Sequence, residues 1–214
     1  MTRVLVTGFE PFGDEATNPS WAAVRLFADA PGAGLEVTAV ELSCVYGLAL
    51  DELRAAVARV EPDLVVCVGQ AGGRPNVTVE RVAINIDDAR IPDNAGRQPI
   101  DVAIVEGGPA AYFATLPIKA CVEAVRAAGV PAAVSHTAGT FVCNHVFYGL
   151  MHLLATEHPA ARGGFVHIPY SSDQVTDRAE PSLPVPTMVT ALRAIVTTAA
   201  SRTEDITAPG GTTH

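Results

Sequence analysis

The sequence predicts an α/β protein, a single-domain three-layer α/β/α sandwich with a twisted, largely parallel (mixed) central sheet. Short runs rich in valine and leucine alternate with longer stretches of helical spacing. Strands that alternate with helices build largely parallel sheets covered on both faces. Of the 214 residues, 49% are hydrophobic and 17% are charged, the composition of a core-rich globular chain. We expect one α/β domain over 1–200 and a flexible polar tail over 201–214.

The expected strands are short and rich in β-branched residues. The first, RVLVTG, is apolar and ends at a glycine, as a buried strand does. The segment VTVERVAINI alternates apolar with polar residues, which favours an exposed or edge strand. The expected strands cover 3–8, 35–42, 63–69, 77–86, 132–136 and 164–168.

The expected helices lie between these strands and after the last one. Asn18 suits the N-cap of the first helix, and Pro19 suits its first position. Between Asp87 and Gly108 the chain shows little periodic signal, and a loop of that length in a compact domain is more often functional than idle. The helices are expected at 18–30, 46–60, 117–128, 144–157 and 185–200.

Charge and hydropathy exclude several classes of partner. The net charge of −9 argues against nucleic acid, which favours a basic face. The apolar N-terminal stretch is too short for a signal peptide, and no apolar run approaches the ~20 residues of a membrane helix. We therefore expect a soluble, cytoplasmic protein with no nucleic acid and no membrane among its partners.

The cysteines are scattered, without a CxxC pair or metal-type clustering, so we expect free thiols. Cys67 lies within a run of valines and Cys121 within an apolar helix, which predicts buried core residues for both. Cys143, in HTAGTFVCNH, stands at a junction between a loop and a helix. The free N–H groups and the positive end of a helix dipole favour a thiolate there, and they suit an oxyanion as well.

A cysteine nucleophile needs an imidazole to accept its proton and a third group to orient that imidazole. His145 lies two positions after Cys143, on nearly the opposite side of a helix, so it is poorly placed. His136 and His167 both end expected strands, and ligands of α/β sheets gather at the carboxyl ends of strands. The residues alone leave the choice between them open, and a structural role for each remains the alternative.

Other motifs give weaker evidence of a function. GQAGGRPN follows a strand but lacks the GxGxxG spacing, and TGFEPFG has no GK[ST], so a phosphate site is unsupported. The histidines do not form HExxH, which leaves zinc without support. Phe9 and Phe12 suit either the core or the wall of a small apolar pocket. Two other classes stay open at this point: a non-catalytic ligand-binding module, and a phosphorylase-like hydrolase on the same scaffold.

Several ordered blocks resemble the pyroglutamyl peptidase I family, also called pyrrolidone-carboxylate peptidase. They are VLVTGFEPFG, NPSW, VGQAGGR, VERVAINIDDARIPDN, GPAAYFATLPIKA, TAGTFVCNH and HIPY, and they run from about Val4 to Tyr170. The resemblance implies a cysteine exopeptidase that removes an N-terminal pyroglutamyl residue from peptides through a thioester. It also implies no metal or organic cofactor, and a homo-oligomer, either a dimer or a tetramer.

The same resemblance assigns the site. It implies Cys143 as nucleophile, His167 as base and Glu80 as the group that orients the imidazole, with Arg90 in transition-state stabilisation. The resemblance gives His136 no role in the reaction. The residues it places around the pyroglutamyl ring are Phe9, Phe12, Gln70, Ile91, Phe141 and Val142.

The chain departs from the family pattern at two positions near the site. Cys44 stands where a threonine is expected, and Phe147 stands where methionine is common. Both changes are expected to reshape the pocket wall without touching the triad, and Cys44 would add a second oxidisable thiol.

Overall fold

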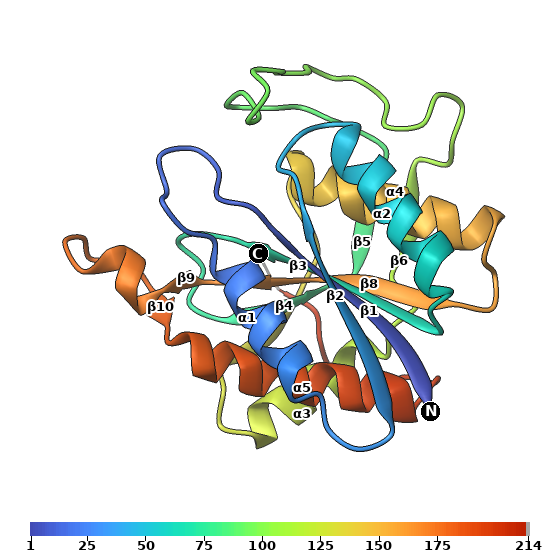
Figure 1. Ribbon diagram of the computed structural model, residues 1–214, viewed down its shortest axis with the longest axis vertical. Coiled ribbons are helices and arrows are strands. Elements are labelled where there is room, and N and C mark those ends of the chain that lie inside the picture. The colour runs from blue at the N-terminus through green and yellow to red at the C-terminus, as the bar shows by residue number, and fades with distance from the viewer. Residues whose placement is uncertain (213–214) are drawn as a thin grey trace.

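The computed structural model describes residues 1–212 and is built around a six-stranded sheet (Figure 1). Every pair of neighbouring strands in it is parallel except β8 with β4, which are antiparallel. The predicted largely parallel, mixed sheet is thus confirmed. In spatial order the strands are β2 (Leu35–Leu42), β1 (Thr2–Phe9), β3 (Leu64–Gln70), β8 (Arg162–Ile168), β4 (Val77–Glu80) and β7 (Ala132–Ser135).

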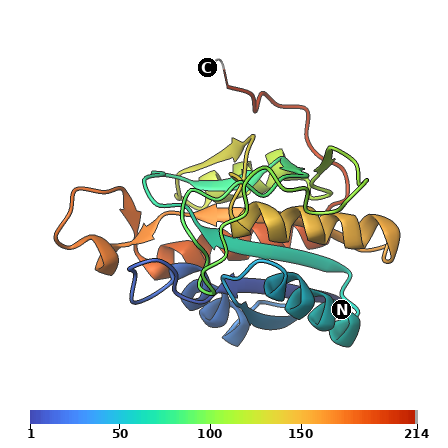
Figure 2. The ribbon, with the colours of Figure 1, turned by 90° about the horizontal axis from the view of Figure 1, so that it is seen from above.

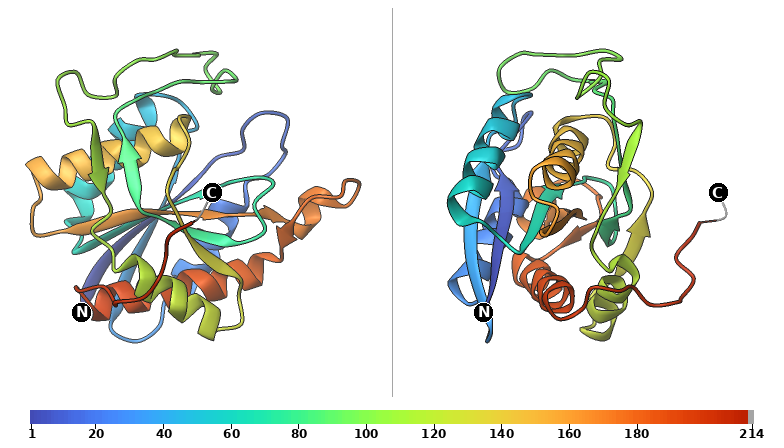
Figure 3. Two further views of the ribbon diagram at one scale, coloured as in Figure 1. Left: turned by 180° about the vertical axis from the view of Figure 1, so that it is seen from behind. Right: turned by 90° about the vertical axis from the view of Figure 1, so that its right-hand side faces the viewer.

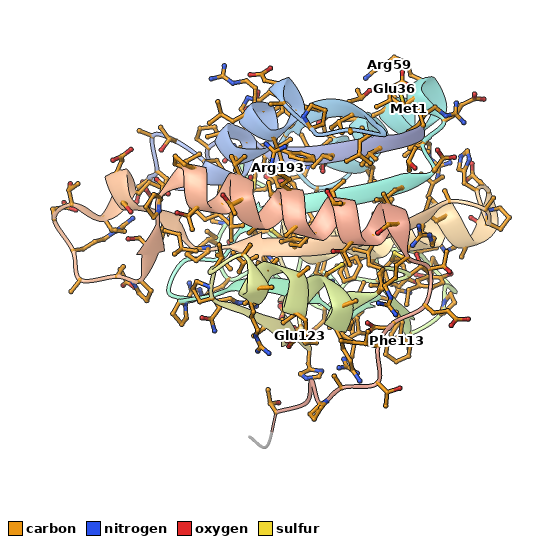
Figure 4. The ribbon with its side chains drawn as sticks, turned by 90° about the horizontal axis from the view of Figure 1, so that it is seen from below. Met1, Glu36, Arg59, Phe113, Glu123 and Arg193 are labelled. Carbon is orange, nitrogen blue, oxygen red and sulfur yellow. The ribbon has the colours of Figure 1, made fainter. Side chains whose placement is uncertain are left out.

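Helices cover both faces of the sheet, which completes the predicted three layers (Figures 1 and 3). One face carries α1 (Pro19–Asp29), α3 (Ile118–Ala127) and α5 (Val185–Ser201). Figure 4 shows this face, with α5 between α1 and α3. The other face carries α2 (Leu48–Val60) and α4 (Val142–Thr156).

The sheet separates two hydrophobic cores because successive side chains of a strand point to opposite faces. In β1, Val4 and Val6 pack with α1, α3 and α5, whereas Leu5 packs with α2 and α4. The first helix begins as predicted: the Asn18 side chain accepts a hydrogen bond from the Ser20 N–H at 3.0 Å, and Pro19 is the first helical residue. A local sequence signal therefore fixes where α1 starts beside β1.

The expected strand at 77–86 is two strands, and the prediction that it is exposed or at an edge is wrong. The chain leaves the main sheet after Glu80, and β5 (Val82–Ile84) pairs antiparallel with β6 (Ala111–Phe113) in a separate ribbon. All four residues of β4 are buried between β8 and β7. The polar members of the alternation, Thr78 and Glu80, are buried because they form hydrogen bonds with each other and with their neighbours in the sheet.

The long segment between β5 and β6 extends beyond the ends of α2 and α4 (Figure 1). Its one bridge joins Asp87 and Val102 within the described chain, so the expected irregular loop is confirmed. Near the C-terminus lie three short elements that the sequence pattern did not indicate, β9 (Tyr170–Ser171), the 3-10 helix η1 (Ser172–Val175) and β10 (Ser182–Leu183). In residues 1–212, no helix is long and apolar enough to cross a membrane.

After α5 the chain passes α3 before it extends away from the sheet (Figures 2 and 3). The carboxylate of Asp205 accepts hydrogen bonds from the N–H groups of Lys119 (3.0 Å) and Ala120 (2.9 Å) at the start of α3. Pro117, the N-cap residue of that helix, supplies no side-chain cap. Asp205 therefore serves as a cap from the tail. The flexibility expected for 201–214 stays a prediction, and residues 213–214 lie outside the described chain.

We expect Asp205→Ala to lower the free energy of unfolding by about 1 kcal/mol, because two N–H groups of α3 lose their acceptor. Urea unfolding followed by circular dichroism measures the change. Glu204→Ala, which removes a neighbouring charge whose carboxylate has no hydrogen bond within residues 1–212, is the matched control. Equal midpoints for the two variants would contradict the capping role.

Candidate active site

The site lies where β3, β8 and β4 run side by side near the carboxyl end of β8. His167 is near the end of β8, opposite Gly69 of β3 on one side and Thr78 of β4 on the other. The ring of His167 lies against that of Phe165, with centroids 4.8 Å apart, on the face that α4 covers. The fold thus places the imidazole beneath the first turn of α4.

Cys143 stands in that first turn. Phe141, with extended backbone, is the N-cap, and α4 begins at Val142, two residues earlier than the sequence pattern indicates. A Cβ atom on Gly69 would lie 2.8 Å from Sγ of Cys143, so a glycine is needed there for the thiol to reach the sheet. Because Gly69 of β3 is in register with His167 of β8, the thiol that lies over Gly69 and the imidazole are on the same face of the sheet.

Glu80 fixes the protonation pattern of His167. Nδ1 of His167 lies 2.8 Å from Oε1 of Glu80, which is fully buried. An ionised carboxylate only accepts hydrogen bonds, so Nδ1 carries a proton and donates it. The free nitrogen of a neutral ring is then Nε2, which is left as the acceptor that a nucleophile requires.

The carboxylate of Glu80 stays ionised despite its burial. Burial alone raises the pKa of Glu80, but the hydrogen bond and charge of His167, the nearby Ser135 hydroxyl and the charge of Arg74 outweigh it, so the pKa is lowered. Nη1 of Arg74 lies 2.7 Å from the same oxygen, Oε1. Glu80 is therefore a charged acceptor between an imidazole and a guanidinium.

In contrast to that of Glu80, which is lowered, the pKa of the Cys143 thiol is raised. Burial raises its pKa, the nearby Cys44 thiol and Glu80 carboxylate raise it further, and Arg74 lowers it. The N–H groups at the start of α4 favour the thiolate, as Arg74 does. Desolvation is the largest of these effects, so we assign a neutral thiol to the resting site, and such a thiol needs a base.

The apolar residues expected around the site fall into two groups. Phe12 and Phe141 lie together, with centroids 6.1 Å apart, and the ring of Tyr46 meets Phe141 edge-on at 5.6 Å. Phe9 and Val142 are buried. They pack in the same core as these rings, beneath the surface.

The other two pocket residues differ in burial. Gln70, at the end of β3, is buried, and its Oε1 accepts a hydrogen bond from Nε2 of Gln174 at 3.0 Å. Ile91 is 40% exposed on the long loop.

The structure does not bring Arg90 to the triad. Its side chain is exposed, and its guanidinium has no hydrogen bond or ion pair with any described residue of the chain. The cation that touches the triad is Arg74, which the sequence reasoning missed. Its one signal is its place in the block VGQAGGR, directly after two glycines that follow a strand. Tyr46, beside Phe141, was missed as well.

The remaining histidine candidates lie away from the thiol. His136 is exposed. Nδ1 of His145 lies 2.8 Å from Oδ2 of Asp87, and its Nε2 accepts a hydrogen bond from the Gly47 N–H at 3.0 Å. Both nitrogens of His145 are thus occupied in holding the long loop and the turn before α2. Of the two histidines that the residues left open, His167 is the one beside Cys143.

The two departures from the family pattern lie at the site's periphery. Cys44 is buried, and burial together with Glu10 and Asp93 raises its pKa to about 12, which makes it a poor nucleophile near neutral pH. Phe147 is fully buried and lies behind Phe165, at 5.8 Å between centroids. Phe147 therefore packs behind Phe165, whose ring lies against that of His167. All four cysteines are free, as expected.

Comparison with known proteins covers nearly the whole chain. Residues 2–202 match the pyroglutamyl peptidase family. A pyrrolidone-carboxylate peptidase of Streptomyces coelicolor is 63% identical over 100% of both chains. The crystal structure of pyroglutamyl peptidase I from Bacillus amyloliquefaciens superposes with a TM-score of 0.94 at 49% identity, covering 96% of this chain and 100% of that one. The pyrrolidone carboxyl peptidase of Thermococcus litoralis gives 0.93 at 37% identity, covering 98% and 100%.

The raised pKa of Cys143 predicts how its alkylation depends on pH. Only the thiolate reacts with iodoacetamide, so we expect the rate at Cys143 to rise about tenfold per pH unit between pH 6 and pH 9. Mass spectrometry of the labelled peptide measures the rate, and Cys143→Ser gives the background from the other cysteines. A rate that is already at its plateau near pH 6 would instead indicate a preformed thiolate.

Proposed function

The chain belongs to the pyroglutamyl peptidase family, and from this premise we propose that Cys143, His167 and Glu80 carry out the removal of an N-terminal pyroglutamyl residue from a peptide. The activity is that of pyroglutamyl peptidase I, a cysteine-type hydrolase. The observation that carries the assignment of residues is the 2.8 Å contact between His167 and a buried carboxylate, with the thiol over Gly69 on the next strand. A ligand-binding module and a phosphorylase-like hydrolase are not favoured.

The first half of the reaction uses the free nitrogen of His167. Nε2 takes the proton of the Cys143 thiol as the sulfur attacks the carbonyl carbon that links the pyroglutamyl residue to the next amino acid. Glu80 stabilises the imidazolium that results and keeps the proton on Nδ1. Because the resting thiol is neutral, this proton transfer accompanies the attack.

The oxyanion of the tetrahedral intermediate forms beside the start of α4. The first N–H groups of a helix have no partner within it, so the N–H of Cys143 is available as a donor. Such a donor typically contributes roughly 3 kcal/mol to the stability of the transition state. Arg90 is the second donor that we propose, and its exposed side chain must turn toward Cys143 to act.

The second half returns the proton. His167 donates it to the leaving amine as the C–N bond breaks, which leaves a thioester between the pyroglutamyl group and Cys143. Water, activated by the same imidazole, then attacks the thioester and releases pyroglutamate and the free thiol. Each step uses groups of this chain and water alone.

The pocket suits a small neutral ring. Phe12, Phe141 and Tyr46 supply aromatic walls, and Gln70 supplies polar atoms at the end of β3. Phe9, Val142 and Ile91 complete the set that we propose to surround the lactam. A charged glutamate would shed its hydration there without an opposite charge, and we infer that this cost excludes it.

We propose that the long loop helps to cover the substrate. Asp88 and Thr140 exchange two hydrogen bonds, from the Asp88 N–H to the Thr140 carbonyl at 3.0 Å and from the Thr140 hydroxyl to the Asp88 carbonyl at 2.7 Å. The Asn94 N–H donates to the Cys44 carbonyl at 3.1 Å. The loop is thereby tied to the turn before the nucleophile and to the segment before α2. Hydrogen exchange with a pyroglutamyl aldehyde should show increased protection at 87–108, and unchanged protection would contradict a covering role.

We infer that the protein is cytoplasmic and forms homo-oligomers, dimers or tetramers. Four free thiols fit a reducing compartment. Phe113, at 71% exposure, and Ile100, at 60%, offer apolar surface for a contact between copies. Light scattering coupled to size exclusion tests the assembly, and a monomer at micromolar concentration would contradict it.

Release of a fluorescent amine from a pyroglutamyl amide tests the function directly. We expect wild type to cleave this substrate and to leave a prolyl amide intact, because the prolyl ring lacks the lactam oxygen. Cys143→Ser should abolish cleavage, since a serine hydroxyl is far less acidic than a thiol and loses its proton to His167 less readily. Pure, reduced wild type that releases nothing would refute the proposed function.

Glu80→Gln tests the role of the carboxylate. An amide has no negative charge and does not fix the proton on Nδ1, so we expect kcat to fall on the order of 10⁴-fold. The pyroglutamyl amide assay measures kcat, and circular dichroism checks that the fold is retained. Near wild-type activity in a folded Glu80→Gln variant would remove Glu80 from the triad.

Gly69→Ala tests the approach of the thiol to the sheet. The new Cβ would lie 2.8 Å from Sγ of Cys143 and 2.9 Å from the ring of Phe165, so one of them must move. We expect a loss of kcat on the order of 100-fold from this misplacement. Gly211→Ala, where a new Cβ meets no atom within 4 Å, is the control and should keep full activity. Equal activity of both variants would show that the thiol lies elsewhere in the active state.

A further inference from the structure

Arg74 reaches the site because of two glycines before it. The loop from β3 to β4 packs against Tyr170, and a Cβ atom on Gly72 would clash with the ring of that tyrosine. Gly73 has a φ of +82°, which an L side chain rarely adopts. Together these residues turn the chain back over β4, so that the side chain of Arg74 points along the strand toward Glu80.

The guanidinium of Arg74 is held by several acceptors in addition to Glu80. Nη1 lies 2.9 Å from Oγ1 of Thr78 and 3.3 Å from Oγ of Ser135, and Nη2 donates to the Thr137 carbonyl at 3.0 Å. The side chain is 29% exposed. A planar, permanently charged group held at both terminal nitrogens has a fixed orientation. It can therefore fix the orientation of a carboxylate that touches it.

The imidazole and the guanidinium donate to one oxygen of the carboxylate. Oε1 of Glu80 lies 2.8 Å from Nδ1 of His167 and 2.7 Å from Nη1 of Arg74. Oε2 is buried and has no hydrogen-bond partner in the described chain. The rotation of the Glu80 carboxylate is thus set by donors to Oε1 alone. Of the two donors His167 and Arg74, only Arg74 takes no part in proton transfer.

We propose that Arg74 is a positioning residue for the peptidase reaction, whose guanidinium holds the Glu80 carboxylate ionised and turned so that Oε1 faces Nδ1 of His167. The inference rests on the proposed roles of Cys143, His167 and Glu80. Arg74 acts through Glu80 and does not contact the reacting atoms.

The charge of Arg74 also sets the direction of a pH effect. The titratable groups that face Glu80 and the thiol are His167 on β8, Cys44 and Tyr46 before α2, and Cys67 on β3. Without the guanidinium, the pKa of Glu80 rises because its burial is less opposed. The active form needs the ionised carboxylate of Glu80, so this change requires a higher pH for activity. The acid limb of activity therefore moves to higher pH.

Arg74→Met and Arg74→Lys separate charge from shape. We expect Arg74→Met to lower kcat about 100-fold, with KM changed by less than about twofold, and to move the acid limb of kcat/KM upward by about one pH unit. Arg74→Lys restores the charge, so it should return the acid limb toward its wild-type position and recover part of kcat. Arg54→Met, which breaks an exposed ion pair with Glu157, is the control and should behave as wild type.

Equal losses in Arg74→Met and Arg74→Lys with an unmoved acid limb would assign Arg74 a purely structural role and overturn the proposal. Full activity in Arg74→Met would overturn it as well. Should Arg74→Met fail to fold, the same comparison is made with Arg74→Gln, which keeps donors but no charge. The acid limb of Arg74→Gln should then move upward as well.

Nitrogen NMR of ¹⁵N-labelled imidazoles tests the proposal without turnover, using His167→Gln to assign the signals. In wild type at neutral pH, we expect the proton of His167 to reside on Nδ1, and in Arg74→Met to be shared between both nitrogens. An unchanged tautomer in Arg74→Met would refute positioning by Arg74. An inactive wild type whose tautomer still depends on Arg74 would refute the proposed function and leave only the orientation of Glu80 by Arg74 supported.

Discussion

The structure of the site depends on one buried charge, the carboxylate of Glu80. With no exposed surface, it depends on protein groups to replace water, and it finds them in His167 on the neighbouring strand and Arg74 from the preceding loop. The antiparallel placement of β4 makes this possible. Thr78 lies opposite His167, and the antiparallel course then carries Glu80 inward, past His167 rather than toward the rim. A parallel strand there would carry its last residue out to the edge, where solvent would weaken the pair.

The alternation of side chains keeps the catalytic face separate from the supporting core. In β8, Phe165 and His167 face α4, whereas Val166 and Ile168 pack with α1, α3 and α5. Aromatic rings form the floor of the site, since Phe147 lies against Phe165 and Phe165 against His167. The imidazole is thus fixed by packing beneath it and by a hydrogen bond at Nδ1. Only Nε2 remains for chemistry, and α4 brings the thiol to the same face.

The sequence predicted what local pattern controls. Valine-rich runs marked the parallel strands, Asn18 and Pro19 marked the start of α1, and the loop-to-helix junction singled out Cys143. The partners of Cys143 depend on strand pairing, which local pattern does not contain. Glu80 and His167 are 87 positions apart, and Glu80 was one acidic residue among 23 until the family resemblance pointed to it. The same alternation that suggested an exposed strand at 77–86 in fact marked polar groups buried within a site, because period-two polarity reports a polar face and not its exposure.

The unpartnered oxygen of Glu80, Oε2, shows that the site lowers the stability of the fold. A buried acceptor without a hydrogen bond typically destabilises a protein by about 1–3 kcal/mol, more when it is charged. Rotation of the carboxylate to share its donors between both oxygens would lessen that cost, but it would loosen the contact with Nδ1 of His167. Concentrating the donors of His167 and Arg74 on Oε1 therefore favours orientation of the imidazole over stability. Glu80 is accordingly a position at which the requirements of folding and of catalysis oppose each other, as expected where a preorganised charge serves a reaction.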